Sequence, residues 1–138
     1  METLTPSQLI LARSRAFTDG DFGFIYDSYH QESNFRRQFT DRATYLEYGR
    51  EALTVDFVID ECRILRERIE EKEARVIFYL DARFRGKRVE TFELALLLPT
   101  DNGWQYHSGQ KLGRDEYRGE IEAIGWEDFE RVVEKTVF

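Results

Sequence analysis

The sequence has few of the residues that build metal sites, disulfides and linkers. Cys62 is the only cysteine, and there are two histidines and two prolines. One cysteine excludes an intrachain disulfide and a cysteine-rich zinc site, so we expect no metal and no other cofactor. The longest apolar run, residues 94–99, is too short to span a bilayer. Residues 1–4 lack the basic start of a signal peptide, so we expect a cytoplasmic protein.

Basic residues are also fewer than acidic residues. The chain has 20 basic and 27 acidic residues, a net charge of −7. Nucleic acids and anionic membranes bind proteins through phosphate neutralisation, so we expect neither as a partner. Arginine outnumbers lysine 16 to 4 and alternates with glutamate in residues 61–90, which predicts cross-strand ion pairs. Residues 113–138 carry −4, so we expect this tail to dock on the sheet, in cis or in a dimer.

Apolar residues are plentiful at 41%, with 14% aromatics, which excludes a disordered chain. The first part of the chain is helical in pattern. Thr5 and Gln8 form a capping box for a helix to about residue 18, ended by Gly20. Asp21 caps a second helix, and a third is predicted over residues 41–53, after a polar loop or short helical turn at 31–39. The second helix has a buried stripe: Phe22, Ile25, Tyr26 and Tyr29.

From residue 55 onward, apolar residues recur at roughly every second position, which is the period of a β-strand. Strands are predicted at 55–68, 75–85, 89–98 and 104–112, and a final helix at 126–136, after a weaker one near 114–122. A turn at Gly86-Lys87 would place Arg83 opposite Glu90, and Phe78 opposite Ala95. Residues 99–103, ending in Asn-Gly, predict the next turn. The apolar stripe of the final helix would be Phe129, Val132, Val133 and Val137.

This order of elements predicts an α+β fold, with N-terminal helices packed on a curved four-stranded antiparallel meander and a C-terminal helical extension. We expect one domain over residues 1–112, with 113–138 as an extension of it. The third strand is apolar on both faces. The helices would cover one face, and the C-terminal helix, a partner subunit or both would cover the other, so we predict a homodimer through the outer sheet face.

Two charged residues interrupt apolar patterns. Arg13 lies on the buried stripe of the first helix, between Leu9 and Phe17, and Glu93 lies between apolar neighbours on its strand face. A buried charge is costly unless it is paired, so an Arg13–Glu93 pair would explain both. Such a pair would either fix the helix on the sheet or form part of a functional site.

Several residues along the chain have the types and the spacing found in a known protein family. In the first half they are Leu9, Arg13, Ala16-Phe17, Gly20-Asp21, Phe24 and His30; in the second half they are Glu93, Trp104, Tyr106 and Gly109. Residues 5–110 thus resemble the nuclear-transport-factor-2-like (NTF2-like, cystatin-like cone) superfamily, and more closely the YchJ-like domains that accompany SEC-C zinc motifs. The chain departs from that pattern in having Gln31 after the histidine and in lacking the SEC-C cysteines.

The resemblance implies a cone with a pocket between helices and concave sheet. Its inward candidates are Arg13, Tyr26, His30, Glu93, Trp104 and Tyr106, each of which also has a packing role open to it. The first interpretation is a noncatalytic domain that binds a small molecule, through Arg13, Tyr26, Trp104 and Tyr106, or another protein. The alternative is an isomerase, dehydratase or hydrolase with His30 or Glu93 as the acid/base group and Arg13 as anion anchor.

Overall fold

A computed structural model describes residues 3–130 and 136–137, with Val55 and the last two described by their backbone only. Helix α1 (Pro6–Asp19) has the predicted capping box: Thr5 Oγ1 accepts a hydrogen bond from the Gln8 amide, and Gln8 Oε1 accepts one from the Thr5 amide. It ends at Gly20 with φ 73°, a left-handed conformation that glycine adopts without strain. Asp21 caps α2 (Phe22–Ser28) as predicted.

The third predicted helix is longer than expected and irregular. After the short α3 (Asn34–Gln38) come α4 (Arg42–Tyr48), a π-helical turn η1 (Gly49–Leu53) and α5 (Thr54–Asp56). Helical structure therefore continues to Asp56, and the first strand begins two residues later than predicted. These helices pack on α1 and α2 through an aromatic core that includes Phe22, Tyr26 and Tyr45.

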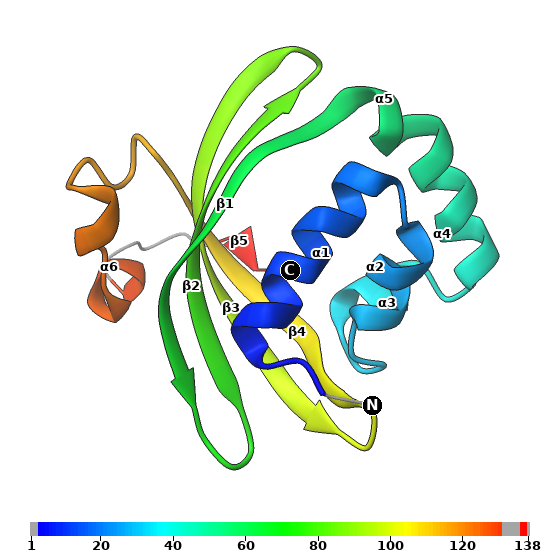
Figure 1. Cartoon of the computed structure of the whole chain (residues 1–138), viewed down its shortest axis with the longest axis horizontal. Coiled ribbons are helices and arrows are strands. Elements are labelled where there is room, and N and C mark those ends of the chain that lie inside the picture. Colours follow the sequence, from blue (N-terminus) through cyan, green and yellow to red (C-terminus); the bar gives the residue numbers. More distant parts are fainter. Residues whose placement is uncertain (1–2, 131–135, 138) are drawn as a thin grey trace.

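The sheet is an antiparallel meander of β1 (Phe57–Ile69), β2 (Ala74–Phe84), β3 (Lys87–Thr100) and β4 (Gly103–Gly113), with the two-residue β5 (Thr136–Val137) added beside β4. Figure 1 shows the sheet curving around α1, with the N-terminal helices on its concave side and α6 (Trp126–Glu130) on the other side. The predicted α+β fold is confirmed.

The β2–β3 turn lies one residue earlier than predicted. Arg85 and Gly86 form it, both with positive φ (54° and 80°), as a two-residue hairpin turn requires. The predicted register is therefore wrong by two residues. Arg83 faces Arg88 rather than Glu90, and Phe78 faces Glu93 rather than Ala95. Because a shift of two preserves the alternation of a strand, the predicted faces of β3 are retained.

Two cores lie on opposite faces of the sheet. Leu9 and Ile10 of α1 pack on Ala95 and Leu97 on the concave face. On the convex face Phe92 is fully buried among residues of the tail. The packed residues of this convex core are Ile77, Tyr79, Phe92, Leu112, Ile124 and Phe129.

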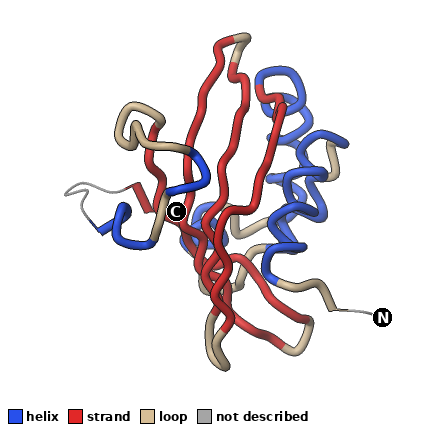
Figure 2. Tube along the Cα trace, turned by 60° about the vertical axis from the view of Figure 1, so that its left-hand side comes forward, coloured by secondary structure: helices blue, strands red, loops and turns tan. Residues whose placement is uncertain are grey.

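The tail docks in cis, as Figure 2 shows for its described part. Arg66 donates a hydrogen bond from Nε to the Ile124 carbonyl at 3.0 Å. The predicted helix at 114–122 is wrong: turns lead to the three-residue 3-10 helix η2 (Ile121–Ala123). The predicted 126–136 helix is also wrong at its end, because Thr136 pairs with Lys111 as a strand. Val132 and Val133 lie outside the described residues. The homodimer through the outer face stays a prediction, and part of that face is already occupied.

Candidate functional site

A cavity of about 150 Å³ lies between α1 and the concave face of the sheet. Most of its wall is apolar, and a buried charged cluster forms part of it. The lining residues are Ile10, Arg13, Ser14, Phe17, Tyr29, Phe57, Ile59, Cys62, Phe78, Leu80, Glu93, Tyr106 and Lys111. The cavity therefore brings together one face of α1, the end of α2 and all four long strands.

Arg13 is held rigidly beside this cavity. Its side chain is buried, with 8% of the residue exposed, and its Nη1 donates a hydrogen bond to Ser28 Oγ at 2.5 Å. The guanidinium lies 4.4 Å from the centre of the Tyr29 ring and 4.3 Å from that of Tyr106. Burial alone would lower the pKa of this guanidinium, but the two tyrosines and Glu93 raise it above its ordinary value. Arg13 is thus a fixed positive charge in contact with two aromatic faces.

Glu93 joins the same cluster through Tyr106. The Tyr106 hydroxyl donates to Glu93 Oε2 at 2.6 Å, and Lys111 Nζ lies 4.0 Å from Glu93 Oε1. The predicted Arg13–Glu93 partnership is therefore indirect, because the Tyr106 ring contacts the arginine while its hydroxyl binds the carboxylate. Gly109 makes room for this hydrogen bond: a Cβ there would lie 2.3 Å from the Tyr106 hydroxyl and 2.8 Å from Glu93 Oε2.

Burial in the cavity wall disfavours the ionised forms of Tyr106 and Cys62. Burial, followed by the charge of Glu93, raises the pKa of Tyr106 well above its ordinary value. Burial also raises the pKa of the Cys62 thiol to about 11, despite a hydrogen bond from Ser14. Since the thiolate is the nucleophilic form of cysteine, Cys62 is a neutral wall residue at neutral pH.

Three of the six predicted inward residues line this cavity, namely Arg13, Glu93 and Tyr106. His30 lies elsewhere, because α2 ends at Ser28 and Tyr29 is extended, so the residue four after Tyr26 leaves the helical face. The His30 ring lies 5.9 Å from that of His107, and its Nδ1 accepts a hydrogen bond from the Glu32 amide.

Tyr26 and Trp104 also lie away from the cavity. The Tyr26 hydroxyl donates to the Phe39 carbonyl at 3.0 Å within the helical core. Trp104 lines a different hollow, next to Asp27 and Gln105. Sequence reasoning missed Tyr29, Cys62 and Lys111 as wall residues. The strand register could have indicated Lys111, because it stands directly opposite Glu93.

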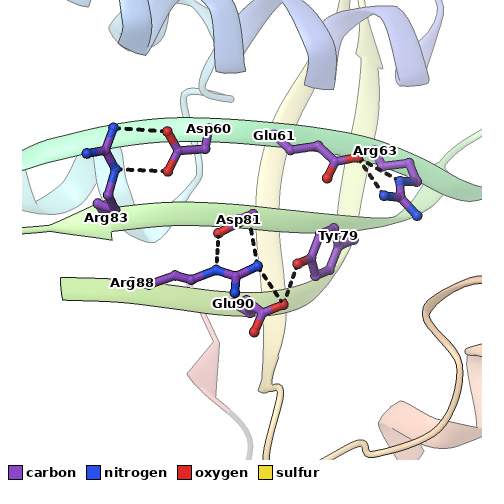
Figure 3. Close-up of polar contacts among 8 residues, drawn as sticks. All are labelled: Asp60, Glu61, Arg63, Tyr79, Asp81, Arg83, Arg88 and Glu90. Carbon is purple, nitrogen blue, oxygen red and sulfur yellow. Dashed lines mark hydrogen bonds and ion pairs between the residues drawn. The ribbon is translucent and has the colours of Figure 1, made fainter. Parts of the chain in front are cut away.

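Several arginines outside the cavity form ion pairs with neighbouring carboxylates, as the arginine excess predicted. Arg83 makes two hydrogen bonds to Asp60 across β1 and β2, at 3.0 and 3.1 Å (Figure 3). Arg88 does the same with Asp81 and lies 3.4 Å from Glu90. These charges neutralise each other on the strands and leave the cavity cluster as the buried charged group of the concave side.

Within residues 3–130 and 136–137, no group of three histidine, cysteine or acidic side chains is placed to hold an ion. In the same part of the chain no helix is long and apolar enough to cross a membrane.

Comparison with known proteins identifies the domain. Residues 5–109 match the family described as the middle, NTF2-like domain of YchJ. The chain belongs to this family. A search of curated proteins finds no match to this YchJ-type domain. The matched span ends within β4, so it includes α1 and Glu93 but not Lys111.

Two solved structures resemble the YchJ-type domain at low sequence identity. One is the solution structure of a SEC-C motif-containing protein from Rhodopseudomonas palustris, with a TM-score of 0.60, 19% identity, and coverage of 76% of this chain and 77% of that one. The other is a crystal structure described as a putative Ca/calmodulin-dependent kinase II association domain from Exiguobacterium sibiricum, with a TM-score of 0.54, 16% identity, and coverage of 82% and 96%. At these identities the likeness shows the NTF2-like fold alone.

Proposed function

We propose that this YchJ-type domain is a noncatalytic binding domain whose cavity takes a small, mainly apolar molecule carrying one hydroxyl or amide group. The observation that carries the proposal is a largely apolar cavity with the buried Glu93–Tyr106 hydrogen bond in its wall. Apolar walls with a few placed polar groups are the usual composition of ligand sites. The carboxylate of Glu93 has acceptor capacity beyond its bond to Tyr106, which a donor on the ligand would use.

The fixed geometry of the cluster supports binding over catalysis. Arg13 is bonded to Ser28 and contacts two rings, while Glu93 is bonded to Tyr106. The alternative of an isomerase, dehydratase or hydrolase placed Arg13, His30 and Glu93 at one cavity, and His30 is not among the described residues that line it. Tyr106 and Cys62, whose pKa values are raised by burial, keep their protons at neutral pH and so do not replace His30 as an acid or base.

A small aromatic alcohol tests this function. Benzyl alcohol is titrated into the isotope-labelled chain while amide chemical shifts are followed by NMR. We expect shifts concentrated at Cys62, Phe78 and Glu93, because these residues surround the cavity. Toluene, which lacks the hydroxyl, should bind more weakly.

A cavity-filling variant supplies the control. Ser14→Leu extends an apolar side chain from α1 into the cavity and should abolish the shifts, whereas Thr18→Leu, one turn later and exposed, should leave them unchanged. Shifts that persist in Ser14→Leu, or that cluster away from the cavity, would contradict the proposal.

A further inference from the structure

A second hollow adjoins the cavity on the same face of the sheet. This hollow, of about 280 Å³, is lined by Phe57, Leu80, Ala82, Phe84, Val89, Thr91 and Lys111. Phe57, Leu80 and Lys111 line both spaces. The strand register explains why the two hollows are neighbours, because Leu80, Ala82 and Phe84 follow Phe78 on alternate positions of β2 and so share its face.

The two hollows differ in chemistry from one end to the other. The Glu93 end is buried under α1, with 7% of Glu93 exposed. The far end lies at the β2–β3 hairpin, where Phe84 is 45% and Val89 41% exposed. Thr91 and Lys111 are the polar members of the wall between them. From Phe78, opposite Glu93, to Ala82, opposite Val89, the strand rises four residues, roughly 13 Å.

Building on the proposed function, we infer that the ligand is a single-chain amphiphile: an uncharged hydroxyl or amide head binds beside Glu93, and a linear alkyl chain follows the concave face to Phe84 and Val89. A compact ligand would fill only the cavity beside Glu93 and would leave two large apolar side chains in water at the far end. A linear chain covers them, because its length is extended in the direction in which the hollows are joined. The head lies where the buried acceptor is, and the chain lies where the wall is apolar.

A homologous series of primary alcohols tests the inference. Binding of hexanol, octanol and decanol to the full chain is measured by the same NMR titration. We expect affinity to rise about fourfold for each added methylene, which corresponds to about 0.8 kcal/mol of buried CH₂. Longer members should extend the shifted amides from the Glu93 region to Ala82, Phe84 and Val89.

Two substitutions at the exposed end of the second hollow test where the alkyl chain of the ligand lies. Phe84→Ser and Val89→Ser should weaken decanol binding several-fold while leaving hexanol binding unchanged, because a short chain ends before these residues. Ile69→Ser is the matched control: Ile69 is 52% exposed on β1 and lines neither hollow, so this variant should bind decanol normally.

The outcomes separate this inference from the proposed function. Affinity that is independent of chain length, or decanol binding unaffected by Phe84→Ser and Val89→Ser, would overturn the amphiphile while leaving the cavity as a site for a compact molecule. That result would also be expected if a second copy or a protein partner covers Phe84 and Val89. Failure of every alcohol, benzyl alcohol included, would overturn both.

Discussion

Gly109 lies where the buried hydrogen bond of the cluster leaves no space for a side chain. In Gly109→Ala the new Cβ would collide with the Tyr106 hydroxyl and Glu93 Oε2, so one or both must move. Both residues are buried, and we expect the free energy of unfolding to fall by about 1–3 kcal/mol from overpacking and a weakened hydrogen bond. Urea denaturation measures the loss.

Gly113→Ala is the matched control for this substitution on the same strand. Its Cβ would meet the carboxylate of Asp115, an exposed side chain that can swing away, so stability should change little. Equal losses in the two variants would show that the effect comes from glycine replacement in β4 and not from the Tyr106–Glu93 contact.

His107 provides a residue-scale prediction about pH. Burial, then the neighbouring His30 and Arg37, lower the pKa of His107, while Glu32 opposes them. The unfolded chain, with a pKa of about 6.5, therefore takes up the proton first as the pH falls. Stability should be complete above pH 6.5 and decline as the pH drops from there toward the folded-state pKa.

Unfolding free energies of the wild type and His107→Gln, measured between pH 7.5 and 5.5, test this sign. The wild type should lose stability on acidification relative to the variant, with a slope below the limit of about 1.4 kcal/mol per pH unit set by one full proton. If the variant lost stability as steeply as the wild type, His107 would not be the responsible group.

At the scale of elements, features that depend on neighbouring residues, such as helix caps, could be predicted from the sequence. The exact positions at which turns lie and helices end could not. Thr5, Gln8 and Gly20 define α1 through caps that act within one turn, so sequence alone located it. The β2–β3 turn was predicted one residue too late, because its first residue is Arg85 at positive φ, an uncommon residue for that conformation. The periodicity of the tail failed at Thr136, because pairing with β4 overrode a helical pattern.

Some residues of the candidate site could also be predicted from the sequence, and others could not. Arg13 and Glu93 were found because each is a charge in an apolar pattern, and burial physics makes such positions stand out. Tyr106 entered through the family resemblance. Tyr29 was assigned to the buried stripe of the second helix and not to the cavity. Lys111 was missed because a lysine on a strand has no distinctive local pattern; only the register of β3 and β4 brings it opposite Glu93.

At the scale of the whole molecule, the tail makes the sheet a layer with cover on both faces. Ile124 and Phe129 are fully or almost fully buried against β2, β3 and β4. The family match ends at residue 109, so this cover comes from outside the matched region. We propose that residues 113–130 fold together with the rest as one cooperative unit. The convex core then contributes to the stability of the same sheet that forms the cavity on its other side.

Phe129→Ala tests that cooperativity. Removing a buried phenylalanine should cost about 3–5 kcal/mol, and because the convex core shares strands with the concave one, the loss should appear in the single unfolding transition of the whole chain. Phe84→Ala, which removes the same group from an exposed position, should cost far less. Calorimetry with amide hydrogen exchange distinguishes the alternatives. If Phe129→Ala exposed only the amides of residues 113–130 and left the protection of β2 and β3 intact, the tail would be an appendage that opens independently of the domain.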